Sequence, residues 1–135
     1  MAGLTHLLDR EVFAAPLHPS GWKGVERRWR QLGDARLGVC VLTAAEVEAA
    51  LLRRQSKRLK NAYQAILKDR LTLVELDGGS VGILADLMDR QQRGKISLEL
   101  TDLTLAAVAL QRNLIVATIR PSRFSLPGLA IEDWS

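Results

Sequence analysis

Short apolar runs alternate with longer stretches of helical periodicity along this chain, and this alternation constrains the fold more than any other feature. The apolar runs span residues 4–8, 37–42, 71–76 and 114–118, with a short fifth run at 129–132. Apolar side chains recur three and four positions apart at 24–32, 44–54, 56–68, 80–93 and 103–112. Strands that alternate with helices form parallel sheets covered on both faces. The pattern predicts a three-layer α/β/α fold with a central, mostly parallel sheet of four to five strands.

The size and composition of the chain predict one compact domain over residues 1–135. A length of 135 residues with 47% hydrophobic content supplies one core. Cys40 is the only cysteine, so an internal disulfide is excluded, and its apolar neighbours predict a buried thiol. No signal-peptide pattern and no membrane-length apolar stretch is recognisable. We therefore expect a cytoplasmic protein that makes no use of a membrane.

The charge balance favours an anionic partner. The formal net charge is +4 and the sequence pI is about 9.7. A basic surface binds polyanions by releasing their counterions, which indicates nucleic acid as a class. The glycine pairs match no phosphate-binding loop. The two histidines, His6 in an apolar run and His18 between two prolines, indicate a packed and a solvated residue rather than metal ligands or a catalytic triad.

Three acidic residues stand where an apolar run or loop passes into a helix: Asp9, Glu46 and Asp102. In a parallel sheet such junctions share one edge, where ligands usually bind. Each acid also has a purely structural interpretation. Asp9 would cap a short helix, Glu46 would complete a capping box begun by Thr43, and Asp102 would complement a helix dipole. Capping is the simpler interpretation of each acid alone, whereas the three together favour a site for Mg²⁺ or Mn²⁺.

A basic segment follows Glu46 at a distance of about two helical turns. Residues 53–60 carry five cations and no acid, and Arg53, Arg54 and Lys57 are its first three cations. These side chains are candidates for guiding a nucleic-acid backbone toward the acids. The alternative is a solvated helix face whose charges complement the helix dipole. The sequence favours the two interpretations equally.

Four segments, in this order and spacing, resemble the PIN-domain nucleases and especially the VapC-type toxins of bacterial toxin–antitoxin pairs. Residues 7–12 (Leu-Leu-Asp-Arg-Glu-Val) resemble an apolar strand that ends in Asp-Thr-Asn-Val. Residues 42–47 (Leu-Thr-Ala-Ala-Glu-Val) resemble the second acidic motif. Residues 93–109 resemble the third motif, an Asp that opens an alanine-rich helix, and residues 115–129 resemble the closing strand and loop. The likeness covers nearly the whole chain.

The resemblance implies a metal-dependent endoribonuclease. Asp9, Glu46 and Asp102 would hold Mg²⁺ or Mn²⁺ as the catalytic ligands. Beside this implied set, Thr118 at the end of the closing strand is a candidate to orient a ligand through its hydroxyl. The implied partners are RNA, a cognate antitoxin protein and a second copy of the chain in a homodimer.

Two departures from the family pattern fall in the chemistry of the site. Arg10 and Glu11 follow the first acid where the family carries a small hydroxyl residue and then Asn or Ser. The closing loop lacks the fourth acid, and Arg123 stands beside Phe124 instead. A positive charge there weakens a second cation most, and Glu99 or Glu11 are the candidates to replace the missing acid. The alternative function is therefore a catalytically inactive PIN-like module that binds RNA or a protein.

Overall fold

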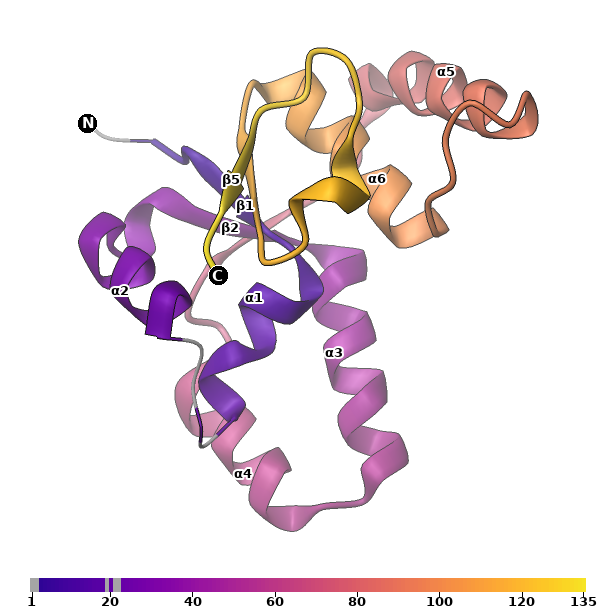
Figure 1. Cartoon of the computed structure of the whole chain (residues 1–135). Helices are drawn as coiled ribbons and strands as arrows, with labels where there is room; N and C mark the ends of the chain where they lie inside the picture. The colour runs from indigo at the N-terminus through magenta and orange to yellow at the C-terminus, as the bar shows by residue number, and fades with distance from the viewer. Residues whose placement is uncertain (1–2, 19, 21–22) are drawn as a thin grey trace.

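Five parallel strands form one sheet at the centre of the molecule (Figure 1). The computed structural model describes residues 3–18, 20 and 23–135. The strands are β1 (His6–Leu8), β2 (Leu37–Cys40), β3 (Thr72–Val74), β4 (Ile115–Thr118) and β5 (Ile131–Asp133). Their order is β3-β2-β1-β4-β5, and every neighbouring pair is parallel. The predicted parallel sheet is confirmed, and its carboxyl ends share one edge.

Helices cover both faces of this sheet and give the three predicted layers. On one side lie α1 (Arg10–Ala14), α2 (Lys23–Leu32), α3 (Val41–Arg54) and α4 (Lys57–Ile66). On the other lie α5 (Val81–Gln92) and α6 (Leu100–Arg112) (Figure 1). The connections contain 3₁₀ turns at Ala15–Leu17, Asp34–Arg36, Gly78–Ser80 and Pro121–Phe124. No helix among the described residues is long and apolar enough to cross a membrane.

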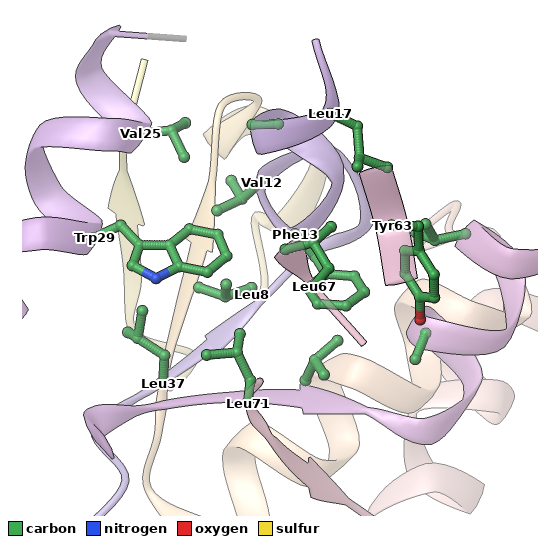
Figure 2. Close-up of a cluster of buried hydrophobic side chains, with 14 of the residues drawn as sticks. Leu8, Val12, Phe13, Leu17, Val25, Trp29, Leu37, Tyr63, Leu67 and Leu71 are labelled. Atoms are coloured by element: carbon green, nitrogen blue, oxygen red, sulfur yellow. The ribbon is translucent and has the colours of Figure 1, made fainter. Parts of the chain in front are cut away.

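Alternate strand residues send their side chains to opposite layers. Leu8 belongs to the core cluster under α1–α4, where the Phe13 and Tyr63 rings meet edge to face at 6.4 Å (Figure 2). Leu7 belongs to the cluster under α6, together with Phe124. Cys40 lies in this second cluster, and burial raises the pKa of its thiol to about 12. The predicted buried thiol is confirmed.

Two predicted helix starts were wrong by three residues. α3 begins at Val41 rather than at residue 44, and α6 begins at Leu100 rather than at residue 103. The run around Val39 is apolar, and a short apolar run does not distinguish a strand from a helix. The chain leaves β2 at Cys40, whose extended backbone caps α3 without a side-chain hydrogen bond. The predicted capping box at Glu46 is therefore wrong, because Glu46 lies in the second turn of α3.

Glu132, the middle residue of β5, links three elements. Its carboxylate accepts hydrogen bonds from Arg28 of α2 and from the Trp134 indole, and it lies 3.4 Å from Nε2 of His6. His6 is 2% exposed, which confirms a packed strand residue, and His18 is exposed as predicted. Hydrogen bonding from Arg28 and from Trp134 and His6 outweighs burial and lowers the pKa of Glu132 to about 2.

Glu132→Gln is expected to lower the free energy of unfolding at pH 7 by about 1–2 kcal/mol. The effect stays in this range because the Glu132 side chain is 30% exposed and solvent screens its charge. The folded-state pKa of about 2 lies below the usual 4.5, so this stabilisation is complete above pH 4.5 and disappears as the pH falls toward 2. Urea denaturation at pH 7 and pH 3 measures it. The exposed Glu75→Gln is the control, and equal losses in both variants would contradict the expectation.

Candidate functional site

The three sequence-predicted acids lie on elements that begin near the carboxyl edge of the sheet. Asp9 directly follows β1, Glu46 lies in the second turn of α3, and Asp102 lies in the first turn of α6. The Asp9 amide donates to the Ala117 carbonyl at 3.1 Å, so Asp9 extends the pairing of the two central strands. The sheet thereby fixes the position of its side chain.

One oxygen of the Asp9 carboxylate caps a helix, and the other has no partner. Oδ1 accepts from the Val12 amide at 2.9 Å, which confirms that Asp9 is the N-cap of α1. Oδ2 is buried without a hydrogen-bond partner among the described residues, and Asp9 as a whole is 1% exposed. An unpaired buried carboxylate oxygen is costly for the fold and is a feature that calls for a ligand.

Burial is the main influence on the Asp9 carboxyl and raises its pKa above the usual value. The Thr118 hydroxyl and the Val12 amide oppose this rise in pKa. The negative charge of Glu11 adds to it, and the positive charge of Arg123 lowers the pKa slightly. The carboxylate is thus held in an environment that disfavours its charge.

Asp102 faces the same region as Asp9. Its side chain is 14% exposed, and burial raises the pKa of its carboxyl. Arg123 and Arg10 lower this pKa, whereas Asp9 and Glu99 raise it. Arg123, which lies 3.7 Å from Asp102, also acts on the charge of Asp9, so the two acids belong to one charged region. Asp102 also lies in the first turn of α6, so the predicted dipole interaction holds as well.

Glu46 forms an ion pair with an arginine. Its Oε2 lies 3.0 Å from Nη1 of Arg10, with side-chain exposures of 32% for Glu46 and 42% for Arg10. Within the described ranges, no group of three or more His, Cys, Asp and Glu side chains is arranged to hold a metal ion. A cation that used all three predicted acids would therefore require Glu46 to leave Arg10.

A second set of ion pairs surrounds Glu11, which follows Asp9 by two positions. The Glu11 carboxylate accepts from Arg123 at 2.7 Å and lies 3.0 Å from Nε of Arg120. Nη1 of Arg123 lies 3.7 Å from Oδ2 of Asp102. Burial works against the charged Arg123, but Glu11, Asp102 and Asp9 together raise the pKa of its guanidinium. Sequence reasoning named Glu11 and Arg123 but gave no sign that they pair.

The remaining predicted residues lie around this centre. Thr118 is fully buried at the end of β4, and its Oγ1 accepts from the Arg120 amide at 3.0 Å. Arg53, Arg54 and Lys57 are exposed where α3 passes into α4, and the structure gives them no ion pair. Their surface is a free positive patch on the described part of the chain.

The residues present fit a divalent cation at Asp9 and Asp102. The unpaired Oδ2 of Asp9 is an oxygen of the kind that Mg²⁺ and Mn²⁺ prefer. The neighbouring Asp102 carboxyl supplies further oxygen, and a positive ion would relieve the repulsion between the two acids. Glu46 would join them only after its ion pair with Arg10 has opened.

Comparison with known proteins finds a family and a set of similar folds. The PIN domain matches residues 7–125. FitAcB from Neisseria gonorrhoeae has a TM-score of 0.84 at 20% identity, covering 96% of this chain and 98% of that one. VapBC2 from Rickettsia felis, bound to a DNA fragment from its promoter, has a TM-score of 0.82 at 15% identity, covering 98% and 100%.

One further structural neighbour is a toxin whose name states what it cleaves. Mycobacterium tuberculosis VapC20, a sarcin-ricin loop cleaving toxin, has a TM-score of 0.63 at 13% identity, covering 83% of this chain and 87% of that one. No curated protein matches the chain. At these identities the structural neighbours establish the shared fold.

Proposed function

Because this chain belongs to the PIN-domain family, we propose that it is a Mg²⁺- or Mn²⁺-dependent endoribonuclease of a toxin–antitoxin pair. It hydrolyses RNA phosphodiester bonds at a site formed by Asp9, Glu46 and Asp102. The observation that carries the proposal is the buried, unpaired Oδ2 of Asp9 beside a second acid, Asp102. A fold keeps such an arrangement at a cost to stability, which is typical of functional sites.

The metal supplies Lewis-acid chemistry when it is bound: it neutralises phosphate charge and acidifies a water molecule. The side chains of the chain have separate tasks. Asp9 and Asp102 would hold the ion, and Glu46 would join them once its ion pair with Arg10 has opened. Thr118 accepts from the Arg120 amide with its oxygen, and its hydroxyl favours the charged form of the Asp9 carboxyl and so would help to orient this ligand.

The exposed basic patch begins on the same helix as Glu46. Arg53 follows Glu46 by seven residues, which places both side chains on one face of α3 at about 10 Å along the axis. Arg54 ends α3 and Lys57 begins α4. An RNA backbone that contacts these cations is directed toward the acidic centre.

The function is tested by incubating the purified protein with total RNA and with defined hairpins. Cleavage is expected with millimolar Mg²⁺ or Mn²⁺, is expected to stop when EDTA is added, and is expected to return when excess metal is restored. A protein sample without added metal is the control. If no RNA is cut with either ion, or if cutting continues unchanged in EDTA, the proposed metal-dependent activity is wrong.

Neutralising the basic patch is expected to weaken RNA binding. Changing Arg53, Arg54 and Lys57 to Gln removes up to three phosphate contacts, so the slope of log K against log salt should become shallower by about 2. Filter binding in EDTA at several salt concentrations measures this slope. The control changes Arg27 in α2, Lys68 after α4 and Lys95 after α5, three exposed cations outside the basic patch, to Gln. An equal effect of both triple variants would show only a dependence on net charge.

One observation favours the alternative function of an inactive RNA- or protein-binding module. Arg10 pairs with Glu46, and Arg123 pairs with Glu11 and lies near Asp102, so the chain partly neutralises its own acids. This alternative predicts RNA retention that is insensitive to EDTA and is accompanied by no cleavage. The chelator experiment therefore separates the two functions.

The proposed partners follow from the toxin–antitoxin assignment. Two structural neighbours, from Klebsiella pneumoniae and Mycobacterium tuberculosis, are described as toxin–antitoxin systems, so we place a cognate antitoxin protein, a homodimeric state and a cytoplasmic location within the proposal. Light scattering of the purified chain tests the homodimer. Co-purification with the product of the adjacent reading frame tests the antitoxin, and a monomer that binds no such product would contradict both.

A further inference from the structure

Arg123 is held between two acids of the candidate site. One amino group, Nη2, lies 2.7 Å from Oε1 of Glu11, and the other, Nη1, lies 3.7 Å from Oδ2 of Asp102. All three side chains are mostly buried, with exposures of 23% for Arg123, 23% for Glu11 and 14% for Asp102. A bridging guanidinium of this kind is a fixed positive charge inside the acidic centre.

The backbone around Arg123 is also fixed. Arg123 belongs to the 3₁₀ turn Pro121–Phe124, and its amide donates to the Arg120 carbonyl at 3.0 Å. The next residue, Phe124, is fully buried in the core cluster under α6. The burial of Phe124 therefore fixes the backbone of Arg123, and Glu11 fixes its guanidinium.

The anchored guanidinium and the unpaired oxygen lie at different places in the centre. Arg123 forms ion pairs with Glu11 and Asp102, whereas Oδ2 of Asp9 makes no hydrogen bond among the described residues. The acidic centre thus contains two acids bridged by a guanidinium and one buried carboxylate oxygen without a hydrogen-bond partner among the described residues.

We propose that Arg123 acts as an internal cation that balances Asp102 and Glu11 and limits the site to one divalent ion, bound at Asp9. This inference rests on the proposed function, because it assigns the metal to the same site. Arg123 is a charge-balancing residue: it keeps the acids assembled in the metal-free protein and lowers the affinity for metal. A fixed positive charge in the same centre repels a divalent ion twice as strongly as a monovalent one, so removing it is expected to raise the affinity for the ion by about tenfold.

Arg120 provides a matched control. Both arginines contact Glu11, but Arg120 is 62% exposed, and the structure gives it no contact with Asp102. Arg120→Gln therefore removes the same formal charge from the same turn without emptying the position next to Asp102. Arg123→Lys is the second control, because it keeps the positive charge in the centre.

The test is Mn²⁺ binding to the full chain by isothermal titration calorimetry, with thermal unfolding measured in parallel. Arg123→Gln is expected to bind Mn²⁺ at least about tenfold more tightly than the wild type, or to bind a second ion. Its melting temperature should fall in EDTA and rise more steeply with Mn²⁺ than that of the wild type. Arg123→Lys keeps the positive charge in the centre, and Arg120→Gln removes a charge that lies largely in solvent. Both variants are therefore expected to bind Mn²⁺ within about threefold of the wild-type affinity.

Three results would contradict the proposed role of Arg123. The first is equal Mn²⁺ affinity and stoichiometry in wild type and Arg123→Gln. The others are a gain in Mn²⁺ affinity in Arg120→Gln, or in Arg123→Lys, as large as that in Arg123→Gln. If Arg123→Gln does not fold in EDTA, Mn²⁺ is expected to restore its folded circular dichroism spectrum, and failure to do so counts against the inference. All of these readouts are independent of RNA cleavage. A wild type that binds Mn²⁺ but cuts no RNA contradicts the proposed function alone, whereas unchanged binding in Arg123→Gln contradicts this inference alone.

Discussion

Asp9→Asn is expected to reduce RNA cleavage at least about 100-fold, because losing one charged contact to the reacting groups costs on the order of 10²–10³ in rate. Asn keeps an oxygen that can accept from the Val12 amide, so the N-cap of α1 is retained. What is lost is the negative charge on the unpaired side of the carboxyl. Single-turnover cleavage of an RNA hairpin in Mg²⁺ measures the effect.

The same substitution is expected to leave the metal-free protein at least as stable as the wild type. Burial raises the pKa of Asp9, so its folded-state pKa lies above the unfolded value of 3.8. For a group shifted in this direction, stability is greatest below the unfolded pKa and falls as the pH rises through the folded pKa. Asp9→Asn removes this loss, so its free energy of unfolding in EDTA should depend less on pH between 4 and 8.

Asp86→Asn is the control for both measurements, because Asp86 is an exposed residue of α5 that pairs with Arg90. Its cleavage rate and its stability should stay close to the wild-type values, since an exposed ion pair contributes only about 0–1 kcal/mol. Cleavage that persists in Asp9→Asn would locate the activity elsewhere. A large loss of stability in Asp9→Asn would show that the carboxylate serves the fold rather than a ligand.

Phe124→Ala is expected to lower the free energy of unfolding by about 3–5 kcal/mol, the largest stability effect that we predict. The Phe124 ring is fully buried in the cluster with Leu7 and Val116 of the two central strands. Its removal leaves a cavity between the sheet and α6, and it releases the turn that carries Arg123. Urea denaturation at pH 7 in EDTA measures the loss.

Phe124→Leu is the control for the size of the side chain. Leucine keeps most of the apolar volume, so its cost is expected to stay near 1–1.5 kcal/mol. A similar cost for Phe124→Leu and Phe124→Ala would mean that packing at this position does not depend on volume. A cost below about 1 kcal/mol for Phe124→Ala would contradict the role of the ring as an anchor.

The sequence predicted the layers and the sheet because these depend on local periodicity. Each apolar run contains a strand, and Asp9 caps a short helix, as its structural interpretation predicted. The start of α3 could not be predicted in the same way, since Val41 and Leu42 continue an apolar run although they are 40% and 42% exposed in the first turn of the helix. Apolar character there did not indicate burial in a strand.

The pairing of charges in the candidate site was beyond local sequence reasoning. Glu11 and Arg123 are separated by 112 positions, and Arg10 and Glu46 by 36. Which arginine meets which acid depends on the order of β1 and β4 in the sheet and on the rotamers of long side chains. The sequence placed the acids at helix starts, but only the fold shows that Asp9 keeps an unpaired oxygen while arginines engage Glu46 and Glu11.

The most direct test of the central claim is anomalous diffraction from a crystal of the protein soaked in Mn²⁺ at neutral pH. The account predicts a peak within about 2.0–2.3 Å of Oδ2 of Asp9, the usual distance for a small divalent cation, with Asp102 bound directly or through water. The peak should disappear in Asp9→Asn. Density for Mn²⁺ that avoids Asp9, or no peak at millimolar Mn²⁺ in crystals of the wild type, would contradict the proposed metal site.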